Sequence, residues 1–158
     1  MKYFIIFHDD NYCNDKEKGL IWTPKKNENN KEVAYWSTIK RIRRDDVIFS
    51  ICNKKLVSLN YAKEGYLQTD SKNIFKEDNN LDKIWILDTQ FNQLKEPIDI
   101  KDKIAEVKDM LKYKYFELID EDSKMVKGYI HEIPNNLGEY IMNFIKEEKL
   151  LEEDIVLV

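Results

Sequence analysis

The hydrophobic and polar positions of the chain first indicate a buried strand followed by a polar connection. Residues 2–7 (KYFIIF) are almost all aromatic or β-branched, which predicts a central strand buried on both faces. Residues 9–18 are polar and rich in Asn and Asp, so we expect a loop there. A short apolar segment follows at 20–22, and Pro24 is expected to stop or bend it.

The middle of the chain combines a helical segment with a hairpin. Apolar residues spaced in threes between Val33 and Ile42 predict a helix or a pair of helical turns, with Trp36 facing inward. The runs VIFSIC (47–52) and LVSLNYA (56–62) are typical of two strands joined by a hairpin turn. Residues 64–82 are polar and irregular, which predicts a loop that holds one short element.

The C-terminal half mixes strands and helices. Residues 83–94 have strand composition, and we expect that strand to end at residues 96–97 (EP). Helical spacing predicts a helix at 100–111, and residues 128–133 predict a further strand. Pro134 is well placed to begin a last helix. Because strands and helices do not alternate strictly, the pattern predicts an α+β fold.

Length and composition limit the class of protein. With 158 residues, 42% of them hydrophobic, the chain is expected to form one domain over 1–158 with its own core, although it is also compatible with the N-terminal part of a longer protein. No apolar run reaches the length of a membrane span, so we expect a cytoplasmic protein. Cys13 and Cys52 lie outside any CxxC pair, and only His8 and His131 could join them as metal ligands. We therefore expect reduced structural cysteines, structural histidines, no metal and no cofactor.

Charge is unevenly distributed along the chain. The net charge of −4 argues against a strongly basic nucleic-acid binder. Residues 1–79, however, carry 15 Lys and Arg against 12 acids, a balance of +3, while the remainder carries 11 against 18, a balance of −7. Cations near the predicted helix could hold phosphates, or could simply complement the helix dipole: Lys25, Lys26, Lys40, Arg41, Arg43 and Arg44.

The candidate chemistry favours recognition over catalysis. The sequence shows no Gly-rich phosphate loop, no evident nucleophile and no metal-ligand cluster. Trp22 precedes Pro24 by two positions, and Trp85 lies between two isoleucines, so in a strand its side chain points away from both of them. If the isoleucines face the core, Trp85 faces solvent or a pocket. These features predict a binding module that is not an enzyme.

Four segments, taken in order, resemble a known family. They are GLIWTP, RRDDVIFSICNKKLVSLNYA, KIWILDTQFNQLKEPI and VKGYIHEIP. Together they resemble the EVE domains of the PUA-like superfamily, which are sisters of the YTH domains, and in particular the modules at the N-terminus of modification-dependent restriction endonucleases. The resemblance extends from residue 2 to about residue 145. It implies a mixed, barrel-like sheet flanked by helices.

The resemblance also implies a function, which is to accept a flipped-out base in an aromatic cage and to read a methyl or related modification. Carried over to this chain, it makes Trp22 and Trp85 the cage walls and Thr23 a polar contact. Further base contacts are expected from the loop after the first strand and from the second strand of the hairpin: Asp9, Asp10, Asn11, Asn60 and Tyr61.

The energetics of base flipping explain why such a site needs aromatic walls. Extruding a base from a duplex costs on the order of a few kcal/mol. Stacking on an aromatic side chain returns roughly 1–3 kcal/mol per base, and a buried methyl group adds about 0.8 kcal/mol. We therefore expect a non-catalytic reader of a modified base in DNA that targets a restriction system, with a nuclease or an ATPase attached or adjacent.

Other functions remain open at the level of the sequence. A reader of RNA, as YTH domains are, fits the same residues. A small metal-dependent nuclease would use scattered residues such as Asp82, Glu117 and Lys124, and a protein-interaction or small-ligand domain would use the acidic segment 146–154. The base, the modification and the oligomeric state are likewise left open.

Overall fold

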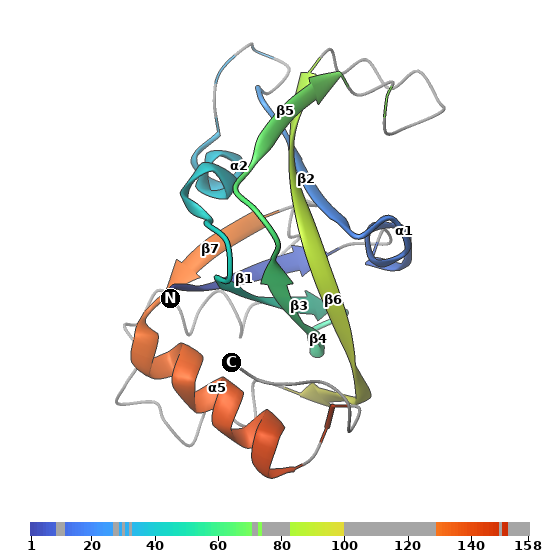
Figure 1. Cartoon of the computed structure of the whole chain (residues 1–158), viewed down its shortest axis with the longest axis vertical. Coiled ribbons are helices and arrows are strands. Elements are labelled where there is room, and N and C mark those ends of the chain that lie inside the picture. Colours follow the sequence, from blue (N-terminus) through green and yellow to red (C-terminus); the bar gives the residue numbers. More distant parts are fainter. Residues whose placement is uncertain are drawn as a thin grey trace.

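The computed structural model describes residues 1–8, 12–26, 29, 31, 33–70, 73, 83–99, 129–148 and 150–151. One mixed sheet of seven strands dominates this part of the chain, in the order β2-β6-β4-β3-β1-β7 with β5 paired to β6 (Figure 1). The elements in chain order are β1 (Tyr3–His8), α1 (Tyr12–Lys18), β2 (Leu20–Pro24), α2 (Ala34–Ser37), the 3-10 helix η1 (Thr38–Arg41), β3 (Val47–Cys52), β4 (Lys55–Ala62), β5 (Leu67–Asp70), β6 (Lys83–Asp99), β7 (Tyr129–Ile133) and α5 (Asn135–Glu147).

Strand β1 is central, as its sequence predicts. It pairs with β3 in parallel and with β7 in antiparallel orientation, and all six of its residues are buried. Helices flank both faces of this mixed sheet, so the α+β prediction is confirmed.

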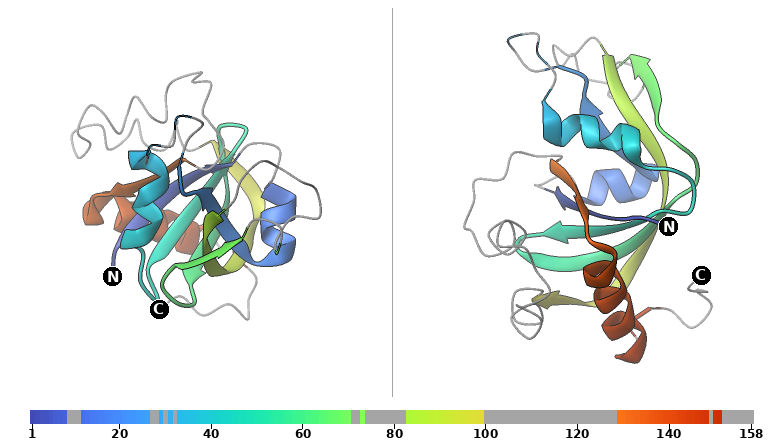
Figure 2. Two further views of the ribbon diagram at one scale, coloured as in Figure 1. Left: turned by 90° about the horizontal axis from the view of Figure 1, so that it is seen from above. Right: turned by 90° about the vertical axis from the view of Figure 1, so that its left-hand side faces the viewer.

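The two faces of β1 support two separate cores. Tyr3, Ile5 and Phe7 belong to a core shared with α5. Phe4 and Ile6 point the other way and pack with residues of η1, β2 and β6. Accordingly, α5 lies on one side of β1, β3 and β4, and α1 and α2 lie on the other (Figures 1 and 2).

Helix α5 confirms the prediction of a last helix that begins after Pro134. Its apolar residues at positions 137, 141, 144 and 145 are all buried. Gly138 allows the close approach of this helix to β1, because a Cβ atom at that position would lie 2.1 Å from the ring of Tyr3. The absence of a side chain at Gly138 therefore fixes how closely α5 packs on the sheet.

The β3–β4 hairpin is also confirmed. Its two turn residues, Asn53 and Lys54, have φ values of 51° and 66°. Positive φ at both central positions is the signature of a type I′ turn, whose twist matches that of the strands it joins. Strand β5 similarly confirms the short element expected between residues 64 and 82.

Two predictions about element boundaries are wrong. Residues 12–18 of the expected loop form helix α1, where Tyr12 and Asp15, three residues apart, are both buried. The strand expected to end at residues 96–97 instead continues to Asp99. Ser58 of β4 pairs with Gln93, but Leu56 pairs with Ile98, so the register shifts across a bulge. Pro97 fits in this bulge because the ladder needs no N–H donor at that point.

The segment 33–42 folds as α2 followed by η1, which confirms the expected pair of helical turns. Ile39 and Ile42 are fully buried, whereas Trp36 is only half-buried. The helix expected at 100–111, and the acidic segment beyond residue 151, lie outside the described residues. Within the described part, no helix is long and apolar enough to cross a membrane.

Candidate functional site

The two tryptophans expected to form a cage do not face each other. In the β2–β6 ladder, Trp22 pairs with Ile86, and Trp85 pairs with Thr23. Neighbouring positions along a strand project to opposite faces, so the two indoles lie on opposite faces of this ladder. Trp22 is half-buried, while Trp85 is 3% exposed and belongs to the core with Ile21. The expectation of a base held between these two rings is therefore wrong.

Two further residues that were expected to contact a base are buried in the interior. Thr23 is fully buried, and its hydroxyl donates a hydrogen bond to the Trp36 carbonyl oxygen at 3.1 Å. Tyr61 is buried in the core beneath α5, on the face of β4 opposite to Asn60. Neither side chain is presented together with Trp22. Asp9, Asp10 and Asn11 lie outside the described residues.

The expected phosphate contacts on η1 and after it lie mostly at the surface. Arg41, Arg43 and Arg44 are exposed, and Arg41 forms an ion pair with Glu132 at 2.9 Å. Arg43 donates through Nη1 to the carbonyl oxygens of Lys40 and Ile42, which holds its guanidinium against the backbone.

Other candidate cations differ in their surroundings. Lys40 is half-buried with its ammonium 4.7 Å from the centre of the Trp85 ring, in a cation–π contact. Lys25 is half-buried and Lys26 is exposed at the end of β2. Four of the candidate cations lie on η1 or directly after it. We call these four residues the cationic segment: Lys40, Arg41, Arg43 and Arg44.

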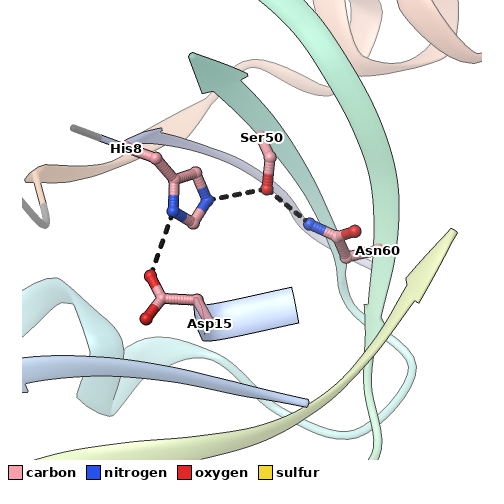
Figure 3. A network of polar contacts seen from close by, with 4 residues as sticks. All are labelled: His8, Asp15, Ser50 and Asn60. Carbon is pink, nitrogen blue, oxygen red and sulfur yellow. Dashed lines mark hydrogen bonds and ion pairs between the residues drawn. The ribbon is translucent and has the colours of Figure 1, made fainter. Parts of the chain in front are cut away.

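A network of buried polar side chains lies elsewhere, between the sheet and α1 (Figure 3). The His8 ring contacts Asp15 through Nδ1 at 3.2 Å and Ser50 Oγ through Nε2 at 2.8 Å. Asn60 donates through Nδ2 to Ser50 Oγ at 2.7 Å. Four elements, namely β1, α1, β3 and β4, each contribute one of these residues.

The register of the sheet explains why these residues meet. Ile6 pairs with Ser50, so His8, two residues further along β1, projects on the same face. Ser50 also pairs with Ser58 of β4, where a bulge at Val57 shifts the register of the hairpin. Bulges re-aim side chains, and this one leaves Ser58 and Asn60 on the same inner face as Ser50.

The chemistry of Asn60 and Asp15 fixes the direction of two hydrogen bonds in the network. The Asn60 amide nitrogen can only donate, so Ser50 Oγ accepts from it. The Asp15 carboxylate can only accept, so His8 Nδ1–H donates to it, and His8 Nε2 lies within hydrogen-bond distance of Ser50 Oγ. The orientation of the Asn60 amide is thereby set by a chain of three hydrogen bonds.

The connectivity of Asp15, His8 and Ser50 is that of a hydrolase triad. Ser50 Oγ is nevertheless already engaged by both His8 and Asn60, so it serves as a link between these two side chains. We therefore assign the network a positioning role. Among the described residues, no group of His, Cys, Asp or Glu is arranged to hold a metal ion.

Three buried polar atoms beside the network have no hydrogen-bond partner among the described residues. They are Tyr12 Oη, Ser58 Oγ and Asn60 Oδ1. Burial raises the pKa of the Tyr12 phenol, and the nearby Ser58 hydroxyl opposes this rise. The two oxygens nevertheless fall short of hydrogen-bond geometry. Uncharged buried polar groups are nearly always paired, so three in one place mark this site as unusual.

Sequence reasoning missed most of this polar site. It treated His8 as structural and named Asn60, but not Tyr12, Asp15, Ser50 or Ser58. A signal was present, since Ser50, Ser58 and Asn60 are polar residues inside strands whose neighbours are apolar. Only the pairing register shows that all three project to the same face.

Comparison with known proteins defines the fold. No protein-family model matches the sequence, and no curated protein matches it either. Among solved structures, Rpa0253 from Rhodopseudomonas palustris is similar over 100% of both chains, with a TM-score of 0.59 and 12% identity.

Two further solved structures are similar. A tyrosine-to-phenylalanine variant of an ASCH protein from Zymomonas mobilis matches over 96% of this chain and 100% of its own, with a TM-score of 0.53 and 10% identity. Atu2648 from Agrobacterium tumefaciens matches over 90% of this chain and 92% of its own, with a TM-score of 0.51 and 14% identity. The chain thus has the PUA-like fold that ASCH proteins share.

Proposed function

We propose that this protein binds nucleic acid and, more specifically, that it reads a modified base in DNA as the targeting module of a restriction system. The PUA-like fold and the resemblance of its segments to EVE domains support this proposal. In this role the chain is not itself an enzyme, and it works with a nuclease or an ATPase in the same or a neighbouring chain.

The cationic segment is the observation that carries the proposal. The chain as a whole has a net charge of −4, yet four cations lie within five residues of one another on one short stretch. Arg43 is already held by two backbone carbonyl groups, so less side-chain entropy is lost when it meets a phosphate. Such contacts position a nucleic acid without reading its sequence.

The Trp22 indole is the stacking surface that we propose for a base. Trp22 is half-buried and lies beside Ile86 on the face of β2 and β6 that points away from the inner core. Stacking on one ring returns roughly 1–3 kcal/mol, which offsets only part of the cost of flipping a base from a duplex. We therefore expect tighter binding to a base that is already unpaired than to the same base in a duplex.

The test compares two charge variants in an oligonucleotide binding titration at low salt. Arg43→Gln with Arg44→Gln removes charge from the cationic segment, whereas Lys55→Gln with Lys95→Gln removes equal charge at the other end of β4 and β6. We expect the first variant to bind about tenfold more weakly to every oligonucleotide, and the second to bind like the parent. Equal affinities for the two variants, or no binding by the parent, would contradict the proposal.

The finer part of the proposal needs matched ligands. DNA and RNA oligonucleotides that differ only in one methylated or hydroxymethylated base are compared for binding to the parent protein and to Trp22→Ala. We expect a preference for modified DNA that Trp22→Ala reduces. A preference confined to RNA would instead support the RNA reader, and equal binding to plain and modified bases would remove the reader function while leaving nucleic-acid binding intact.

A further inference from the structure

The three buried atoms without partners point to a ligand. Tyr12 Oη, Ser58 Oγ and Asn60 Oδ1 are shielded from solvent, and no described residue forms a hydrogen bond with them. Leaving such groups unpaired costs free energy, so a site that keeps several of them gains when a ligand supplies the partners. They lie together because Tyr12 and Ser58 are neighbours and because Ser58 and Asn60 project from the same face of β4.

The hydrogen-bond network restricts what the ligand must offer. The Asn60 amide nitrogen is held by Ser50, which is held by His8, which in turn is held by Asp15. The part of Asn60 left for a ligand is its carbonyl oxygen, which can only accept a hydrogen bond. A ligand that satisfies it must therefore donate an N–H or O–H group.

Aromatic rings beside the polar atoms favour a flat ligand. The ring centres of His8 and Tyr12 lie 5.3 Å apart, and Phe91 lies 6.4 Å from His8 and 6.3 Å from Tyr12. Phe91 is half-buried and pairs with Asn60 across the β4–β6 ladder, so this group of rings reaches the surface. An exposed hydrogen bond from Lys16 of α1 to Gln93 of β6 lies at the same edge.

We propose that Tyr12, Ser58 and Asn60 form the selective part of a nucleobase site, in which Asn60 Oδ1 accepts a hydrogen bond from an N–H group on the pairing edge of the base. Within this site, the two hydroxyls complete the contacts to that edge, since each can donate or accept. His8, Asp15 and Ser50 are positioning residues that hold the Asn60 amide. This inference rests on the proposed nucleic-acid function and adds the chemical feature by which a second base is read, since Phe91, the partner of Asn60, projects from β6 on the face opposite to Trp22.

The N–H requirement is tested with pairs of bases in which a methyl group replaces one N–H hydrogen. N6-methyladenine retains an amine hydrogen that N6,N6-dimethyladenine lacks, and thymine retains the imide hydrogen that N3-methylthymine lacks. Each base is placed at the centre of an otherwise identical single-stranded oligonucleotide. We expect at least one pair to show about tenfold weaker binding for the base without the hydrogen, because a site built to accept N–H rejects an analogue that lacks it.

Two variants of the protein test the same site from the other side. Tyr12→Phe and Ser58→Ala each remove a hydroxyl that has no described partner, so the free protein should keep or slightly raise its melting temperature. The same variants should bind the preferred oligonucleotide about tenfold more weakly, and thereby reduce the discrimination between the paired bases. Tyr66→Phe, which alters an exposed tyrosine, serves as the matched control and should change neither property.

Different failures have different meanings. If both variants lower the melting temperature and leave binding unchanged, the hydroxyls have structural partners such as buried water, and the site is wrong. If oligonucleotides bind but neither pair is discriminated, the site is also wrong while nucleic-acid binding stands. If no oligonucleotide binds, titration with the free nucleosides separates the two proposals. Discrimination between the paired nucleosides would support the nucleobase site and contradict the proposed nucleic-acid function. Equal binding of the paired nucleosides would overturn both proposals.

Discussion

At the scale of single residues, the polar network shows how a few side chains can be positioned inside an apolar sheet. Ser50 and Asn60 lie in strands whose buried residues are mostly apolar, and they are tolerated because each has a hydrogen-bond partner. Asp15 completes the chain from outside the sheet, through α1. The network therefore couples the docking of a short helix to the orientation of an amide in β4.

This coupling predicts that Asp15 stabilises the fold. Asp15→Ala leaves the Nδ1–H group of His8 buried without its partner, which should cost about 1–3 kcal/mol of unfolding free energy. Chemical denaturation followed by circular dichroism would measure the difference. Glu17→Ala, on the exposed side of the same helix, is the control and should change stability by no more than about 0.5 kcal/mol. An equal effect of both variants would show that the contact contributes little.

The raised pKa of Tyr12 predicts greater sensitivity to alkali. Burial disfavours the phenolate, so the unfolded chain loses this proton at a lower pH than the folded chain does. The corresponding stability is fully present below the ordinary pKa of 10.0 and is lost as the pH rises toward and through the raised pKa. Tyr12→Phe should therefore lose less stability than the parent between about pH 8 and about pH 11, as measured by urea denaturation.

At the scale of elements, the packing of α5 on β1 depends on a missing side chain. A Cβ atom at position 138 would lie within 2.5 Å of three atoms of the Tyr3 ring. Gly138→Ala should thus destabilise the protein by about 1–3 kcal/mol, although alanine is the better helix former. Thermal denaturation tests this, with Asn143→Ala at an exposed position of the same helix as the control. A stabilised Gly138→Ala variant would show that α5 can move away from the sheet at little cost.

An element could be predicted from the sequence when the residues that determine it lie close together in the chain. The β3–β4 hairpin and α5 were predictable because a two-residue turn, a proline and an apolar stripe are all local features. Helix α1 was not predictable, since its Asn and Asp residues favour a turn and its buried face has only Tyr12 and Asp15. It is held by contacts with distant residues, among them Asp15 with His8 and Tyr12 with Phe91, which no local pattern reveals.

At the scale of the whole molecule, charge predicts how nucleic-acid binding should respond to salt. If the cationic segment supplies the phosphate contacts, the logarithm of affinity should fall with the logarithm of salt concentration with a slope of about −0.7 per contact for a single strand. Arg44→Gln should make the slope shallower by about that amount, and Lys55→Gln should leave it unchanged. Titrations over a series of salt concentrations would measure both slopes, and an unchanged slope in Arg44→Gln would exclude that residue from the interface.

The sequence by itself determined the α+β class, the buried central strand, the hairpin and the last helix of this protein, because each depends on the spacing of apolar residues and on turn chemistry within a short stretch. It also carried the resemblance to the PUA-like superfamily. Only the tertiary structure decided that Trp22 and Trp85 lie on opposite faces of one ladder, and that residues from β1, α1, β3 and β4 meet in one polar network. Register between distant strands sets which face each side chain occupies, and a shift of one residue reverses it, so composition and spacing within a segment cannot specify it.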